Sequence, residues 1–304
     1  FFEILDIAKR KPIRHLMVNT NGIRIARDFS FAEQLASYMP DFEIYLQFDS
    51  FKAEVLEKLR GKDLRDVRIK ALEHLNQLNL STTLVVTLQK GENDDEIGKI
   101  IEFALQQRCV RGVTFQPTQV AGRLENFNPA TDRITMTDVR RKILDQTTIF
   151  QPNDLVPVPC NPDALLMGYA LKLGGEVIPL TRYIDPSVLL DNSTRNSIIY
   201  EQDSALQDQL LKIFSTGISV DKVDENMKQL LCCLPQVSAP GLKYENLFRI
   251  IIMRFIDAWD FDVRAIKKSC VHIVHKDGRI IPFETMNLFY RDEKEEHLKK
   301  LINN

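Results

Sequence analysis

Short apolar runs alternate with amphipathic helical stretches over the first 120 residues of the chain. Phe1, Ile4, Leu5 and Ala8 recur at helical spacing, which predicts the end of an amphipathic helix before the first run. The apolar runs, which predict strands, are His15–Asn19, Glu43–Phe48, Thr83–Leu88 and Arg111–Gln116. Strands separated by single helices form right-handed βαβ units, so the pattern predicts a parallel sheet of the α/β class.

This alternation stops after Thr118, and we therefore predict two regions, 1–118 and 119–304. Residues 119–160 are polar and rich in proline, which is typical of a linker or a wrapping segment. Helices are predicted over 163–173, 205–230, 245–258 and 293–300. Two apolar runs around the Asp277-Gly278 turn predict a β-hairpin, so the second region is expected to be α+β.

Composition restricts the class of protein. The chain has 304 residues, a net charge of −2 and 44% hydrophobic residues, which is ordinary for a soluble globular protein and predicts no nucleic-acid or membrane-surface partner. No apolar run is long enough to span a bilayer. Five scattered cysteines without a C-x-x-C pair favour a reducing cytoplasm over a disulfide framework.

The carboxyl ends of the four predicted strands are polar, and in parallel α/β folds ligands bind at those ends. The ends read Asn19-Thr20-Asn21-Gly22, Gln47-Phe48-Asp49-Ser50, Thr87-Leu88-Gln89-Lys90-Gly91-Glu92-Asn93 and Gln116-Pro117-Thr118. Polar residues also gather wherever strands meet loops. Four such ends in succession nevertheless predict a ring of neutral hydrogen-bonding groups around one polar ligand.

The same strand ends, taken in order, resemble the radical S-adenosylmethionine (radical SAM) superfamily, in the branch of molybdopterin-precursor cyclases. The runs VNTNGIRIA, IYLQFDSF, KGENDDEIGKIIEFA and RGVTFQP, with CVHIVHKDGRIIPF near the carboxyl terminus, resemble its tetraether-lipid-synthase-like subgroup. The resemblance implies a partial (β/α)6 TIM-like barrel in which the four strands are the third to the sixth. Residues 119–304 would then cover the barrel opening.

The resemblance also implies cofactors and chemistry. Family members reductively cleave S-adenosylmethionine with a [4Fe–4S] cluster, and the resulting 5′-deoxyadenosyl radical abstracts hydrogen from a substrate. The cluster-binding C-x-x-x-C-x-x-C loop does not occur in the 304 residues, and neither does a Gly-Gly-Glu-Pro segment. We expect both upstream of Phe1, and we expect the 304 residues alone to be inactive.

Partners and substrate follow from the same resemblance. It implies an electron donor such as ferredoxin or flavodoxin and a small-molecule or lipid substrate, the lipid from the subgroup alone. A pterin-type cyclisation is the alternative reaction. A degenerate α/β binding module that never carries a cluster is the alternative of a different class.

Eight residues at the strand ends are candidates for binding the cofactor, because amides and hydroxyls both donate and accept hydrogen bonds and one carboxylate accepts them. By the resemblance, Gln116 and Pro117 would border the adenine through their backbone. Asn21 and Gly22 can instead form a turn, Asp49 can cap a helix over 51–60, and Glu96 can form a capping box with Asn93. No catalytic residue is identified. The candidates are Asn19, Asn21, Gln47, Asp49, Thr87, Asn93, Gln116 and Pro117.

Cys160 and Cys270 are the candidates for ligands of an auxiliary iron–sulfur cluster, again by resemblance. Glu284 stands where the subgroup has a cysteine in the hairpin, and this departure weakens the prediction. We interpret Cys109, beside a helix end, as a small buried hydrophobic residue.

Overall fold

The computed structural model describes residues 1–13, 15–120, 127–158, 161–173, 175–182, 246–291 and 294. Its main sheet begins with the four predicted strands, which pair in parallel and in chain order. All four predictions are confirmed to within one residue at each end. The strands are β1 (Leu16–Thr20), β2 (Phe42–Gln47), β3 (Thr82–Leu88) and β4 (Val110–Pro117).

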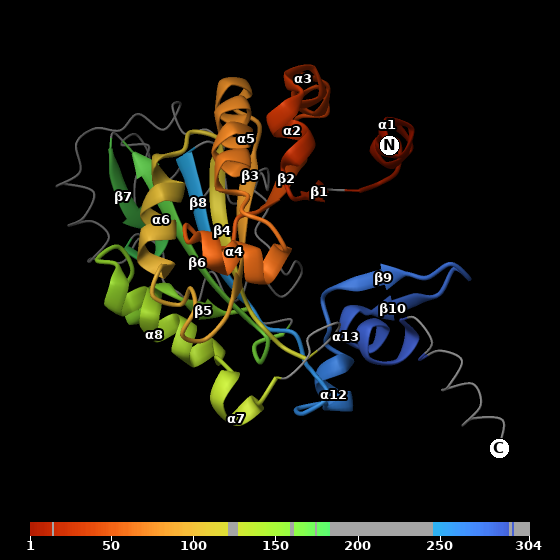
Figure 1. The fold of residues 1–304 in the computed structure, drawn as a ribbon, viewed down its shortest axis with the longest axis vertical. Helices are drawn as coiled ribbons and strands as arrows, with labels where there is room; N and C mark the ends of the chain where they lie inside the picture. The colour runs from red at the N-terminus through yellow and green to blue at the C-terminus, as the bar shows by residue number, and fades with distance from the viewer. Residues whose placement is uncertain are drawn as a thin grey trace, which may run out of the picture.

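Helices between these strands pack on one face of the sheet, which we call the outer face (Figure 1). On β2 the alternate residues Phe42, Ile44 and Leu46 lie in this packed core, because successive strand residues point to opposite faces. The helices between the strands are α2 (Ile23–Arg27), α3 (Phe29–Ala36), α4 (Ala53–Arg60), α5 (Arg65–Leu78) and α6 (Ile97–Gln106). α1 (Phe2–Lys9) precedes β1, and α7 (Pro129–Asp132) and α8 (Met136–Gln146) follow β4. The predicted wrapping segment 119–160 thus includes α8, which packs on α6 and β8.

The sheet continues beyond β4 with strands from the second half of the chain. β8 (Leu247–Met253) pairs with β4 in parallel, and β6 (Leu165–Leu173) pairs with β8 antiparallel. β5 (Val156–Pro157) and β7 (Glu176–Pro179) both pair with β6. The main sheet thus has eight strands and stays open among the described residues, as expected for a partial barrel.

The helices predicted over 163–173 and 245–258 are wrong, because both segments form strands in this sheet. In β8 six consecutive residues are buried, so the sequence lacks the alternation that marks a half-exposed strand. The predicted helix 205–230 lies outside the described residues, as does 293–300 apart from Lys294. The predicted division at residue 118 stays a prediction, although the main sheet contains strands from both sides of it.

The predicted hairpin is confirmed as β9 (His272–Val274) paired with β10 (Ile280–Pro282). It lies with α12 (Val263–Ile266) and α13 (Phe283–Thr285) beyond the end of β8 (Figure 1). Single turns complete the described structure at Pro152–Asp154, Leu180–Arg182 and Met286–Tyr290.

Candidate functional site

The face opposite the helices, which we call the inner face, carries the polar side chains of β1 to β4. The carboxyl ends of these strands form one edge of the inner face, which we call the upper edge. There the Gln47 Nε2 amide of β2 donates to Asn19 Oδ1 of β1 over 3.2 Å. Asn19 is exposed and Gln47 is half-buried, so this amide pair remains accessible. The register places Thr87 of β3 beside Gln116 of β4 along the same edge. Four of the predicted site residues therefore lie on one edge of one face.

Asn21 lies just beyond this edge in a turn. Its Oδ1 accepts the N–H of Ile23 over 3.1 Å, and Gly22 has a φ of 79° and begins α2. A Cβ on Gly22 would lie 2.8 Å from Leu46 Cδ1, so both the conformation and the space favour glycine. The turn interpretation of Asn21 and Gly22 is therefore confirmed, while a ligand contact of Asn21 stays a prediction.

Asp49 is fully buried directly after β2, and its carboxylate accepts four hydrogen bonds from the protein. Arg60 donates through Nε and Nη2, both at 2.9 Å, and Arg68 donates through Nη2 at 2.9 Å. The backbone N–H of Thr87 donates the fourth bond at 3.1 Å. Asp49 does not cap α4, whose N-cap is Lys52, so the capping alternative is wrong. The carboxylate instead fixes α4, α5 and β3 around the end of β2.

Asn93 is buried in the loop after β3 and also bonds to the protein. Its Nδ2 donates to the carbonyl oxygens of Asp49 and Thr87, both at 2.9 Å, and its Oδ1 accepts the N–H of Gln89 at 2.9 Å. These bonds connect the ends of β2 and β3. The Oδ1 and the Nδ2 of Asn93 therefore both bond to protein atoms. A cofactor contact of Asn93 stays a prediction.

Glu96 does not form the predicted capping box with Asn93. It is the N-cap residue of α6 without a side-chain capping bond, and its carboxylate accepts the Ser50 hydroxyl and the N–H of Phe51. Glu96 therefore holds the loop between β2 and α4 against α6. The spacing of residues in the sequence does not reveal these hydrogen bonds.

Three buried side-chain oxygens in the loops after β3 and β4 have no hydrogen-bond partner. They are Gln89 Oε1, which follows β3, and Thr118 Oγ1 and Gln119 Oε1, which follow β4. A buried acceptor without a partner is destabilising by about 1–3 kcal/mol, so these atoms favour a ligand that donates hydrogen bonds here. The strand-end pattern contains all three residues but does not single them out.

The middle of the inner face carries Tyr45 of β2. Its hydroxyl donates to Thr114 Oγ1 of β4 over 2.7 Å. Burial raises the pKa of Tyr45 to about 12, although the Thr114 bond and the charge of Arg249 act the other way. The phenol therefore stays protonated at neutral pH. The alternation of Glu43, Tyr45 and Gln47 along β2 is the sequence signal for this column of polar residues.

At the lower end of the column, Glu43 is fully buried and paired with Arg249 of β8. Arg249 Nη2 lies 2.7 Å and 2.5 Å from the two carboxylate oxygens, and His15 Nε2 lies 2.8 Å from Oε2. The Thr83 hydroxyl also donates to this carboxylate. Burial alone would raise the pKa of Glu43, but the charge of Arg249 and the bonds from His15 and Thr83 outweigh it and lower the pKa to about 2. The carboxylate is therefore ionised and its charge is balanced.

Arg249 reaches Glu43 by crossing β4 at Gly112. The register pairs Gly112 with Arg249, and a Cβ on Gly112 would lie 2.6 Å from Arg249 Cγ. The absent side chain at this position is what lets the arginine lie along the sheet. The close approach of Arg249 thus explains why position 112 is a glycine, although glycine inside a strand ordinarily weakens the sheet.

A second ion-pair network joins the segment after β4 to the segment after β8. Arg133 Nη2 lies 2.8 Å from both oxygens of the fully buried Asp257, and Asp257 Oδ2 also accepts the N–H of Val120 at 3.2 Å. Asp260 bonds to both Arg133 and Arg254. Sequence reasoning missed this network, because its members are far apart in the chain.

The described cysteines do not form a cluster site. Cys109 is buried, and burial raises the pKa of its thiol to about 11, so its interpretation as a small hydrophobic residue is confirmed. Cys270 is exposed, and Cys160 lies outside the described residues. Within the described part of the chain, no three His, Cys, Asp or Glu side chains group as metal ligands. An iron–sulfur cluster needs several cysteine thiolates, so these residues do not fit one.

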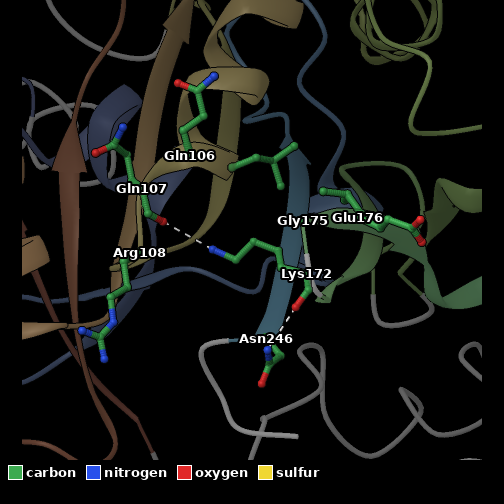
Figure 2. A pocket seen from close by; sticks show the side chains of 9 residues that line it. Gln106, Gln107, Arg108, Lys172, Gly175, Glu176 and Asn246 are labelled. Carbon is green, nitrogen blue, oxygen red and sulfur yellow. Dashed lines mark hydrogen bonds between the residues drawn. The ribbon is translucent and has the colours of Figure 1, made fainter. Parts of the chain in front are cut away.

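A cavity of about 390 Å³ lies at the other end of the sheet, between the end of α6 and the β6–β7 hairpin (Figure 2). Lys172 Nζ donates there to the carbonyl oxygens of Gln107 at 3.4 Å and Val110 at 3.0 Å. A cation at the end of a helix offsets its unpaired carbonyls, which accounts for Lys172 without a ligand. The cavity is separate from the carboxyl ends of the strands.

Comparisons with known proteins agree with the fold. Residues 1–104 match the family model of the Radical SAM superfamily. A 7,8-dihydro-6-hydroxymethylpterin dimethyltransferase of Methanocaldococcus jannaschii is 30% identical over 331 aligned residues, which cover 97% of this chain and 65% of that protein.

Two further proteins are similar to shorter parts of this chain. A probable GTP 3′,8-cyclase of Thermococcus kodakarensis is 33% identical over 104 residues, covering 34% of this chain and 33% of that protein. A mycofactocin maturase of Mycolicibacterium smegmatis is 23% identical over 114 residues, covering 38% of this chain and 28% of that protein. The chain thus spans about two thirds of the first relative and about a third of the others.

None of the described helices is long and apolar enough to cross a bilayer. The tetraether-lipid subgroup stays a prediction, since none of these relatives is named for a lipid reaction. The superfamily prediction is confirmed by the family model, the ordered strand ends and the parallel α/β sheet together. Residues 1–104 therefore belong to the radical SAM superfamily.

Proposed function

We propose that the full-length protein is a radical SAM enzyme that cleaves S-adenosylmethionine reductively and uses the 5′-deoxyadenosyl radical to abstract hydrogen from a substrate. The observation that carries the proposal is the row of neutral, accessible or unpartnered polar groups along the upper edge of the inner face. Membership of the superfamily and its enzyme-named members support it.

The upper edge fits the chemistry of S-adenosylmethionine. Its ribose hydroxyls and its amino groups are hydrogen-bond donors, and Gln89 Oε1 and Thr118 Oγ1 are buried acceptors without partners. The Asn19–Gln47 amide pair adds a further donor and acceptor beside them. We assign Asn19, Gln47 and Gln116 to contact with the cofactor, and Pro117 to the backbone that borders its adenine.

Asp49, Thr87 and Asn93 would then act on the shape of the edge rather than on the cofactor. Asp49 and Asn93 spend their side-chain hydrogen bonds on protein atoms, and the Thr87 hydroxyl accepts from Arg60 at 3.2 Å. This assignment separates the predicted residues into two groups by where their hydrogen bonds go.

The cluster that would supply the electron has no ligands among the described residues. The predicted cysteine loop upstream of Phe1, the auxiliary cluster at Cys160 and Cys270, and a ferredoxin or flavodoxin donor all stay predictions. So does the inactivity of the 304 residues alone. The sequence of the complete gene tests the first of these directly.

For the substrate we favour a pterin-like ring over a lipid chain. The relative aligned over 97% of this chain is named for a dihydropterin. The column of Glu43, Tyr45 and Gln47 on the inner face is polar, and an alkyl chain on it would cover the accessible Asn19–Gln47 amide pair without new hydrogen bonds. Whether the reaction is a methylation or a cyclisation is left to product analysis.

The test is anaerobic turnover by the full-length protein with a strong reductant and S-adenosylmethionine. We expect bound iron and sulfide and the formation of 5′-deoxyadenosine above a control without reductant. Absence of both the cluster and 5′-deoxyadenosine would contradict the proposal and favour a binding module that never carries a cluster.

A further inference from the structure

The side chain of Tyr45 extends along the inner face. It starts on β2 and its hydroxyl reaches Thr114 on β4, while β3 runs between these two strands. Neighbouring strands are about 4.8 Å apart, so the side chain and its hydrogen bond together bridge ~10 Å along the sheet. That is the reach of an extended tyrosine with one hydrogen bond, and a ring standing away from the sheet could not span it.

The ring lies over β3, where the register places Thr83 beside Tyr45 and Val85 beside the next inner residue of β2. Tyr45 is half-buried, so part of the residue remains accessible. The hydroxyl bond to Thr114 fixes the orientation of the ring before any ligand binds.

The surroundings of the ring are polar but electrically balanced. On one side the Glu43 carboxylate is paired with Arg249, and on the other lies the Asn19–Gln47 amide pair. Asn19 is also the residue of β1 that pairs with Tyr45 in the register. An aromatic ring in polar, charge-balanced surroundings suits a flat heterocycle that stacks and forms hydrogen bonds in its own plane.

We propose that Tyr45 is a platform on which a planar nitrogen heterocycle of the substrate stacks. This inference rests on the proposed function and names the substrate class of the same site. The adenine of S-adenosylmethionine has the same chemistry. By our assignment S-adenosylmethionine lies along the upper edge, from the Asn19–Gln47 pair to Gln116 and Pro117, so Tyr45 below that edge serves the substrate.

The experiment measures two dissociation constants with the full-length protein under anaerobic conditions. The probes are 6-hydroxymethyl-7,8-dihydropterin, followed by its fluorescence, and S-adenosylmethionine, followed by equilibrium dialysis. Aromatic stacking predicts that Tyr45→Leu weakens pterin binding by roughly tenfold. Tyr45→Phe keeps the ring and is expected to stay within about threefold of the wild type, since it loses one hydrogen bond. The affinity for S-adenosylmethionine is expected to be unchanged in both.

Tyr38→Leu is the matched control. Tyr38 is also half-buried and its hydroxyl also bonds within the protein, to Asp6, but it packs with Phe2 and Phe42 on the outer face. It should leave both constants unchanged. Should Tyr45→Leu fail to fold, Thr114→Val releases the ring from its anchor and is expected to weaken pterin binding about threefold.

Three results would overturn the inference: no pterin binding by the wild type, equal pterin binding by Tyr45→Leu, or a loss confined to S-adenosylmethionine. The last would assign the platform to adenine. Formation of 5′-deoxyadenosine without pterin is measured on the same preparations. If it occurs while pterin does not bind, only this inference fails. If it is absent while pterin binds through Tyr45, only the proposed function fails.

Discussion

Two groups of polar side chains lie at the carboxyl ends of the same strands, and they differ in where their hydrogen bonds go. The buried group around Asp49, with Arg60, Arg68 and Asn93, bonds to protein atoms of α4, α5, β2 and β3. The upper edge of the inner face, at Asn19 and Gln47, is accessible and forms one side-chain bond of 3.2 Å.

A polar strand end therefore has two separate uses. In the Asp49 group the side chains replace the missing backbone partners of loops and fix the positions of the neighbouring helices. At the upper edge, side chains without strong internal bonds remain available to a ligand. Both groups fall on the same sequence motifs, so only the structure separates them.

The largest expected effect comes from breaking the buried group. Asp49→Ala leaves Arg68, which is 1% exposed, without its carboxylate partner. Removal of one member of a buried ion pair lowers the free energy of unfolding by about 3–5 kcal/mol. Chemical denaturation of the purified chain measures this change.

The matched control is Asp95→Ala, because Asp95 pairs with Lys52 at the surface and its side chain is 64% exposed. Exposed pairs contribute less than about 1 kcal/mol, so this variant should unfold near the wild-type midpoint. Equal destabilisation by the two variants would contradict the structural role of Asp49.

Acid pH tests the balanced pair in the lower part of the inner face. The pKa of Glu43 is about 2 in the folded chain and 4.5 as the ordinary value, so its contribution to stability is complete above about pH 5 and is lost as the pH falls toward 2. Linkage predicts that lowering the pH from 6 to 3 removes roughly 2 kcal/mol through this group. Urea denaturation at both values measures it.

Glu43→Gln removes the titrating group from this comparison. The variant is expected to be less stable at pH 6, and its further loss on going to pH 3 should be smaller than that of the wild type by the same roughly 2 kcal/mol. Parallel losses in the two chains would show that the carboxylate is not held ionised by Arg249.

The sequence predicts the first half of the sheet well because β1 to β4 alternate with helices and end in recognisable polar motifs. It fails for β6 and β8. The run LFRIIIM of β8 has six buried residues in succession, and buried strands cannot be told from buried helices by periodicity. Its β-branched Ile250, Ile251 and Ile252 are the signal that favours a strand.

The candidate site is predictable in position but not in the division of roles. Strand order places Asn19, Gln47 and Gln116 on one edge, since carboxyl ends of parallel strands coincide. The partners of Asp49 and Glu96 depend on helices packed from elsewhere in the chain, and the Glu43–Arg249 pair joins residues of β2 and β8. Such long-range bonds leave no local sequence signal.

The affinity of the full-length Gln47→Ala variant for S-adenosylmethionine tests whether the upper edge of the inner face binds the cofactor. Because Gln47 is half-buried with one internal side-chain bond, its free energy of unfolding should change by less than about 1 kcal/mol, whereas loss of one ligand hydrogen bond should raise the dissociation constant about fivefold. An unchanged dissociation constant at wild-type stability would contradict the claim that the upper edge of the inner face binds the cofactor.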